Sequence, residues 1–269
     1  MQNKKLSPFR VMLAMLILLG IGYGAFLSWK TAKETVSIDA PTPWFGQYVD
    51  VTSTPRYGFE QYIDSQGQKN LVLAFIVSLK DDACTPSWGG VYTLDQAGVE
   101  LDLDRRIARL IQRGGNIAIS FGGLLNDELS VNCTDEDKLL DAYDLVINRY
   151  SLDTIDMDIE GKGLTNTDAV KRRAAVLAKL QTKYREEGKN LAIWLTLPVA
   201  PQGMTAQGTD AVSAMLESGV DIAGVNVMTM DYGGSKEESD SMQEASELAL
   251  VETHRQLGIL YKLACFFAI

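Results

Sequence analysis

The sequence predicts an α/β protein of the (β/α)8 TIM-barrel type, in which the barrel is incomplete. Short apolar runs alternate with segments of helical spacing, as expected of parallel strands joined by helices. The run Leu71 to Val77 is continuously apolar, which is typical of a strand buried on both faces. Polar and acidic residues follow several runs, at the strand ends where such barrels carry their active sites.

Six strands and five helices account for the pattern. The strands are expected at 45–51, 71–77, 116–121, 154–160, 191–197 and 222–230. The helices are expected at 101–113, 135–150, 167–187, 209–217 and 239–257. Several of these helices end at a glycine, such as Gly188, Gly219 or Gly258, which is a common signal for a helix C-terminus.

A doubly wound sheet is the alternative arrangement. It would need a glycine-rich phosphate loop after the first strand, and the segment Thr52-Ser53-Thr54-Pro55 is not one. A barrel is therefore favoured, with about six of its eight βα units present. The residues after Gly258 allow at most one more strand, so we expect the barrel, residues 44–269, to be truncated before its last strands.

The N-terminal residues 1–29 are predicted to be a signal anchor or a signal peptide. The stretch from Val11 to Trp29 is 19 residues without a charge, about the length of a transmembrane helix. Lys4, Lys5 and Arg10 precede it, which places the N-terminus in the cytoplasm. An uncleaved anchor is favoured because the only cleavage-like sequence, Gly22-Tyr23-Gly24, lies inside the stretch.

Either interpretation places the rest of the chain outside the cytoplasm, on the cell membrane facing outside or secreted. Residues 30–43 are expected to be a linker, extended near Pro41-Thr42-Pro43. The formal net charge of −10 argues against nucleic acid as a partner. Three cysteines and one histidine argue against a zinc site and a Ser-His-Asp triad, so we expect neither a metal nor a cofactor.

Three acidic side chains share one face of the predicted strand at 154–160. Alternate residues of a strand point the same way, which groups Asp156, Asp158 and Glu160 and leaves apolar residues on the other face. Carboxyls this close repel one another, so at least one should stay protonated near neutral pH. Such a group suits catalysis by a carboxylic acid of raised pKa beside an ionised partner. A solvent-facing acidic edge strand is the alternative, although Asp is unfavourable in strands.

Three motifs in order resemble those of glycoside hydrolase family 18, the chitinases and related endo-N-acetylglucosaminidases. They are DxxDxDxE at Asp153–Glu160, SxGG at Ser120–Gly123, and the sixth-strand motif at Met228–Tyr232. The resemblance extends from Trp44 to Leu257, and Tyr48-Val49-Asp50 resembles the first strand of a bacterial and archaeal branch. The family's tryptophan on the eighth strand has no counterpart here.

The resemblance implies hydrolysis of β-1,4 bonds in N-acetylglucosamine polymers such as chitin, by a retaining mechanism assisted by the substrate's acetamido group. Glu160 would be the general acid. Asp158 would orient the acetamido group and stabilise the oxazolinium ion, and Asp156 would share a proton with Asp158. The alternatives are a non-catalytic glycan-binding barrel, or a hydrolase of other acetamido-glycans such as peptidoglycan or N-glycans.

Four substrate-binding candidates lie near the first and third strands. Ser120 is expected to hydrogen-bond Asp156. Gly122 and Gly123 would let a sugar ring approach the backbone, although a plain turn is a comparable interpretation. Tyr48 is expected either to reach the acid cluster or to pack in the core.

Four further candidates lie elsewhere. Met228, Asp231 and Tyr232 end the sixth strand, and the last two resemble groups that hold the acetamide and the sugar. Many relatives have tyrosine where Met230 stands, so the hydroxyl that contacts the acetamide is an open question. Trp88 is a candidate sugar-stacking platform, or alternatively a loop anchor.

Cys84 and Cys133 lie in the loops after the second and third predicted strands. These loops are neighbours at the same end of a barrel. We therefore hypothesise that the two cysteines form a disulfide in an oxidising compartment.

Overall fold

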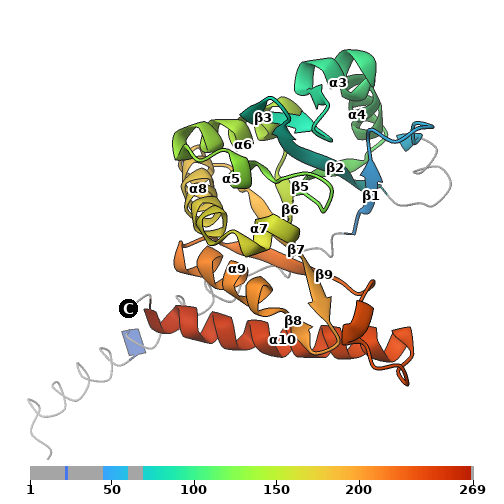
Figure 1. Ribbon diagram of the computed structural model, residues 1–269. Coiled ribbons are helices and arrows are strands. Elements are labelled where there is room, and N and C mark those ends of the chain that lie inside the picture. The colour runs from blue at the N-terminus through green and yellow to red at the C-terminus, as the bar shows by residue number, and fades with distance from the viewer. Residues whose placement is uncertain (1–21, 24–44, 60–68, 268–269) are drawn as a thin grey trace, which may run out of the picture. The chain divides into compact units, whose positions relative to one another are not determined.

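The structure, a computed structural model, describes residues 22–23, 45–59 and 69–267. The chain divides into two units, Met1–Trp44 and Phe45–Ile269. The described part of the second unit holds a curved parallel sheet with helices packed against it (Figure 1). Among the described residues, this unit holds every strand and every helix other than the short segment at Gly22 and Tyr23.

Six parallel strands follow one another across the sheet in chain order, as in a barrel. They are β1 (Gln47–Asp50), β2 (Asn70–Leu79), β5 (Asn116–Gly122), β6 (Thr154–Asp158), β7 (Ala192–Ala200) and β9 (Ile222–Met228). The six strands expected from the apolar runs are thereby confirmed. In the described residues β1 and β9 pair with β2 and β7 but not with each other, so the barrel is not closed.

Strand β7 continues through Pro198, where the sequence predicted its end. Its pairing with β6 stops at Thr196, and at Leu197 and Pro198 it pairs with β9 alone among the described strands. Proline lacks a backbone N–H and is tolerated where one side of the strand needs no partner. The strand then turns back on itself into the short β8 (Gly203–Met204).

The five expected helices are all present. They are α4 (Leu103–Gln112), α6 (Glu136–Tyr150), α8 (Thr167–Glu186), α9 (Ala206–Glu217) and α10 (Met242–Phe267). Side-chain caps start three of them: Asp135, Asn166 and Thr205 each accept a backbone N–H from the first turn of α6, α8 and α9, respectively. Such caps satisfy donors that have no partner within the helix.

Helix α10 corrects the prediction of an end at Gly258 followed by at most one more strand. It runs on to Phe267. A glycine inside a helix costs only about 1 kcal/mol relative to alanine. The sequence that follows contains Leu260, Lys262 and Ala264, which favour a helix, so the glycine is passed over.

Several short elements were not expected. They are β3 (Asp82–Trp88), β4 (Tyr92–Thr93), α3 (Leu94–Glu100), α5 (Leu129–Asn132), α7 (Gly161–Thr165) and the 3-10 turn η1 (Gly233–Ser235). Strand β3 runs antiparallel to β2 and places Trp88 in the core. The Trp88 indole N–H donates to the Tyr150 hydroxyl at 3.0 Å. With no exposed surface, Trp88 cannot be a sugar-stacking platform, and that prediction was wrong; the residue is an anchor.

The disulfide hypothesis is confirmed, because Cys84 of β3 and Cys133 at the end of α5 are bonded, with their Cα atoms 4.7 Å apart. Within residues 22–23, 45–59 and 69–267, no helix is both long and apolar enough to cross a membrane. The predicted hydrophobic segment, Val11 to Trp29, lies outside the described residues apart from Gly22 and Tyr23, and the linker 30–43 lies wholly outside them.

Candidate active site

The acidic strand has the alternation that the sequence predicts. Ile155, Met157 and Ile159 are fully buried in the apolar core, while Asp156 and Asp158 are buried on the opposite side of the backbone. Strand β6 ends at Asp158 instead of Glu160. Glu160 lies two residues further on, half-buried, at the N-terminal cap position of α7, where its side chain makes no capping hydrogen bond.

Three hydroxyl groups surround the carboxylate of Asp156. The Ser120 hydroxyl donates to Oδ2 at 2.7 Å and the Tyr48 hydroxyl donates to the same oxygen at 3.0 Å. Thr196 donates to Oδ1 at 2.6 Å. Burial raises the pKa of Asp156, and the three hydrogen bonds oppose this by stabilising the ionised form. The expectations that Ser120 and Tyr48 reach the acid cluster are confirmed.

Thr196 and Asn226 were missed at the sequence level. Thr196 lies beside Asp158 in the β6–β7 register, and its hydroxyl is 2.8 Å from that of Tyr48. The Asn226 side chain of β9 donates to Thr196 at 3.2 Å. Both are polar residues within otherwise apolar strands, which is the signal that could have revealed them.

Tyr48 joins the two outer parallel strands through side chains alone. Its hydroxyl accepts a hydrogen bond at 3.5 Å from Asn226, although β1 and β9 are not paired in the described sheet. Burial of the hydroxyl, followed by the charge of Asp156, raises the pKa of Tyr48 far above its ordinary value. Tyr48 therefore stays protonated and remains a hydrogen-bond donor to Asp156.

Asp158 is the carboxyl that the site holds protonated. Burial is the main cause, and the negative charges of Asp156 and Glu160 add to it, which together raise the pKa of Asp158 to about 8. Its Oδ1 is buried without a hydrogen-bond partner among the described residues. Burial also raises the pKa of Glu160. The sequence predicted that at least one carboxyl of the cluster stays protonated near neutral pH, and Asp158 is that carboxyl.

The glycines of the SxGG motif pack against the acidic strand. Gly122 has φ +112°, and a Cβ there would lie 2.1 Å from the carbonyl oxygen of Asp158. The N–H of Gly123 donates to that same oxygen at 2.9 Å. The backbone that these glycines approach is therefore that of β6, and the predicted approach of a sugar ring stays a prediction.

The side chains of the sixth-strand motif, Met228–Tyr232, do not all face the same way. Met228, half-buried, is the last residue of β9. Asp231 is exposed just beyond it. Tyr232 is buried, and its hydroxyl donates to Ser246 of α10 at 3.4 Å. The structure therefore does not bring the Tyr232 hydroxyl to the acid cluster, whereas a ligand role for Met228 and Asp231 stays a prediction.

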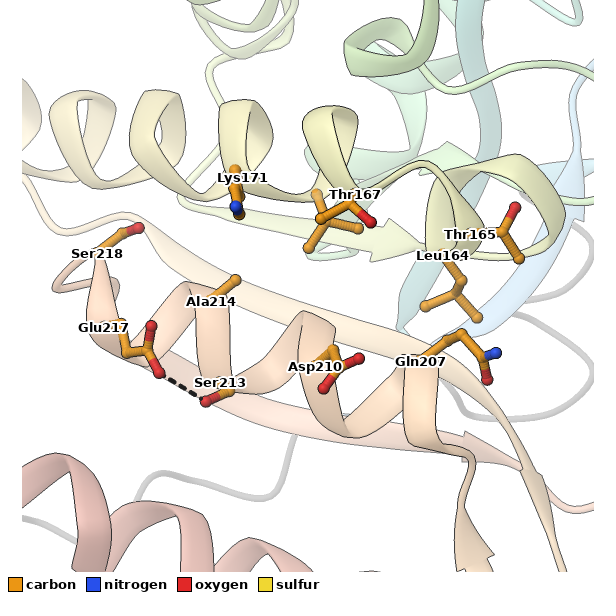
Figure 2. A pocket seen from close by; sticks show the side chains of 11 residues that line it. Leu164, Thr165, Thr167, Lys171, Gln207, Asp210, Ser213, Ala214, Glu217 and Ser218 are labelled. Atoms are coloured by element: carbon orange, nitrogen blue, oxygen red, sulfur yellow. Dashed lines mark hydrogen bonds between the residues drawn. The ribbon is translucent and has the colours of Figure 1, made fainter.

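A surface groove lies away from the acid cluster of Asp156, Asp158 and Glu160. A groove of about 740 Å³ runs between α9 and the α7–α8 segment, and Figure 2 shows its lining, with Lys171 on α8 and Asp210 and Glu217 on α9. None of the acid-cluster residues lines it. Within the described part of the chain, no group of three or more His, Cys, Asp or Glu side chains is arranged to hold a metal ion.

The raised pKa of Asp158 predicts a stability that falls with pH. The folded protein keeps this proton up to about pH 8, whereas an unfolded chain releases it near the ordinary value of 3.8. The contribution of Asp158 to the free energy of unfolding is therefore complete below pH 3.8 and is lost by the time the pH has risen through about 8. Between these two pKa values the loss is about 1.4 kcal/mol per pH unit.

Replacing Asp158 by Asn, which is neutral at every pH, should remove this dependence. We expect the free energy of unfolding of the wild type to fall relative to Asp158→Asn between pH 5 and pH 8, by a few kcal/mol on the order given by linkage. Urea denaturation at several pH values measures it. A difference that is constant across this range would contradict the protonation of Asp158.

The fold and the site together define an α/β protein of the barrel type, with interacting carboxyls at the C-terminal end of a central parallel strand. This is the end of the strands at which barrel enzymes carry their active sites. No family model matches the chain. It is 32% identical over 245 residues to the "Probable bifunctional chitinase/lysozyme" of Escherichia coli (strain K12), a match covering 88% of this chain and 27% of that protein. It is also 32% identical over 213 residues to "Endochitinase 11" of Metarhizium anisopliae, covering 78% of this chain and 40% of that protein.

Among solved structures, the catalytic domain of a hyperthermophilic chitinase from Pyrococcus furiosus matches with a TM-score of 0.69 and 26% sequence identity. That match covers 82% of this chain and 68% of the other. These findings show that the chain is similar to chitinases over most of its length, in agreement with the resemblance of its motifs to glycoside hydrolase family 18. The chain spans well under half the length of the two curated relatives, 27% and 40%.

Proposed function

We propose that this protein hydrolyses β-1,4 glycosidic bonds in N-acetylglucosamine glycans such as chitin. The observation that carries the proposal is the carboxyl cluster: a buried Asp158 with a pKa near 8, between the hydrogen-bonded Asp156 and the half-buried Glu160. The names of both curated relatives, which describe chitinases, support the same substrate class.

The proposed mechanism is substrate-assisted and retaining. Glu160, whose pKa is raised by burial, donates its proton to the glycosidic oxygen as the leaving sugar departs. The carbonyl oxygen of the substrate's 2-acetamido group attacks the anomeric carbon and forms an oxazolinium ion. The Glu160 carboxylate then takes a proton from the water that opens this ion, so the original configuration is restored.

In this mechanism the two aspartates manage charge beside the acetamido group. Asp158 begins protonated and Asp156 begins ionised, because three hydroxyls donate to Asp156. Passage of the proton from Asp158 to Asp156 would leave a negative charge on Asp158 where the oxazolinium ion forms. Ser120 and Tyr48 would act through Asp156, and Met228 and Asp231 would contact the sugar.

We also propose that the barrel works outside the cytoplasm, on the outer face of the cell membrane or secreted. Support comes from the 19 uncharged residues of Val11 to Trp29 and the basic residues before them. The disulfide between Cys84 and Cys133 supports an oxidising compartment. Membrane attachment through residues 1–29 would place the site near insoluble glycans.

Peptidoglycan is a second candidate substrate, because one relative carries both chitinase and lysozyme in its name. It contains N-acetylated sugars, which the substrate-assisted mechanism requires. A glycan-binding barrel without activity is the remaining alternative, and the open edge between β1 and β9 is the feature that favours it.

The test compares three substrates with the full chain. We expect release of chromophore from a chromogenic di-N-acetylchitobioside and none from the matched cellobioside, which differs at its 2-positions by lacking the acetamido groups. Release of reducing ends from peptidoglycan alone would favour the second candidate. Binding to chitin without turnover of any substrate would contradict hydrolysis and favour the binding barrel.

A further inference from the structure

A buried ion pair lies beside the segments that follow β5 and β6. Arg173 of α8 has no exposed surface, and Glu128, which caps α5, is 3% exposed. The guanidinium Nη1 donates to Glu128 Oε2 at 3.3 Å and to the Ser130 hydroxyl at 3.2 Å. The Tyr143 hydroxyl donates to the other carboxylate oxygen. Burial and the charge of Glu128 raise the pKa of Tyr143, so it remains a donor.

The same guanidinium reaches the segment that begins at Glu160. Arg173 Nη2 donates to the carbonyl oxygen of Gly163, in α7, at 3.1 Å. Gly163 in turn donates its N–H to the carbonyl oxygen of Glu160 at 2.8 Å. One rigid group therefore connects the Glu128 carboxylate with the turn that sets the backbone of Glu160.

Glu128 also lies near the glycine side of the site. A Cβ added to Gly122 would lie 3.5 Å from Glu128 Cγ, so the stem of the Glu128 side chain lies close to the end of β5, next to the Asp158 carbonyl. The network thus joins the segment after β5 to the segment after β6. An apolar pair of similar volume could fill this space at little cost to stability, so packing alone does not require charges here.

We propose that Arg173, together with Glu128, is a positioning residue for Glu160. It fixes where α7 begins and hence how deeply the Glu160 carboxyl is buried, which is the cause of that group's raised pKa. The inference rests on the proposed function in giving Glu160 the role of general acid. It adds a residue from α8 that does not touch the substrate.

Two variants remove the connection and keep the protein foldable. Arg173→Lys retains a positive charge beside Glu128, but an ammonium cannot span both partners as the planar guanidinium does. The double variant Arg173→Met, Glu128→Met replaces the pair by apolar side chains and leaves no unpaired buried charge. Gln181→Met is the matched control, because Gln181 is a buried α8 residue that donates to the carbonyls of Leu191 and Asp221, both at 2.9 Å, remote from α7 along the helix.

The measurements are the pH dependence of kcat on a chitooligosaccharide, per mole of folded protein, and amide hydrogen exchange of residues 160–166. A less buried Glu160 has a lower pKa and loses its proton sooner, so both variants should shift the basic limb of the profile to lower pH. We expect kcat to fall between about tenfold and a hundredfold, KM to stay within about twofold, and exchange in α7 to accelerate. Gln181→Met should lose stability without these changes.

A basic limb and α7 exchange identical to the wild type in both variants would overturn the proposal, however much stability they lose. A shift of equal size in Gln181→Met would overturn it too, because the effect would then report general loosening of α8. If the unaltered protein hydrolyses no substrate, the proposed function fails, and the exchange data alone decide whether Arg173 holds α7 in place.

Discussion

Replacement of Glu160 by Gln is expected to lower kcat by about 10² to 10⁴, the usual contribution of general acid catalysis. Glutamine has the same shape, but it has no acidic proton to give to the glycosidic oxygen. KM should change little, because the amide retains the size and polarity of the acid. Steady-state kinetics on a chitooligosaccharide measures the effect.

The loss should also depend on the leaving group. A sugar leaves poorly without protonation, whereas a nitrophenolate leaves readily, so Glu160→Gln should be impaired more on the oligosaccharide than on the aryl glycoside. Glu187→Gln, at an exposed glutamate after α8, is the control and should behave as the wild type. Equal losses on the two substrates would argue against proton donation by Glu160, and an unchanged kcat would remove the residue from the mechanism.

Gly122→Ala is expected to have the second large effect, on both stability and activity. Its added Cβ would lie 2.1 Å from the Asp158 carbonyl oxygen, and the backbone of β5 or β6 would have to move. Overpacking of this kind costs about 1–3 kcal/mol, and φ +112° adds about 1–3 kcal/mol of strain for a residue with a side chain. Because the displaced strand carries Asp158, kcat should fall along with stability.

A matched variant separates the two causes. Gly219 also has a positive φ, +84°, but a Cβ added there would meet no other atom within 4 Å. Gly219→Ala should therefore lose only the conformational part of the stability and keep its activity. Thermal unfolding and kcat are measured for both. If Gly122→Ala were no less stable than Gly219→Ala and equally active, the close packing of the glycine loop on β6 would be disproved.

Local periodicity was sufficient to predict much of this molecule. The alternation in β6 depends only on neighbouring residues, so it identified the shared face of Asp156 and Asp158 without knowledge of the fold. Apolar runs located the six parallel strands in the same way. The predictions failed where a local signal was outweighed by the surrounding sequence. At Gly258, for example, the glycine predicted a helix end, but α10 continues through it.

Tertiary structure decided which residues surround the carboxyls of the acid cluster. Thr196 reaches Asp156 because β7 pairs with β6. Asn226 reaches Tyr48 although their strands, β9 and β1, are not paired in the described sheet. Tertiary structure also decided where side chains point. Trp88 and Tyr232 both stand next to glycines in motif-like segments, but Trp88 points into the core and Tyr232 points toward α10.

By itself, the sequence determined the order of the six parallel strands and the five main helices, the acidic face of the fourth parallel strand and the family that its motifs resemble. The tertiary structure decided which carboxyl keeps its proton, how Glu160 is held and which candidates face away. The physical reason is that backbone periodicity is set by neighbours in the chain. Burial and hydrogen bonding, which shift a pKa and fix a side chain, are set by groups that only folding brings together.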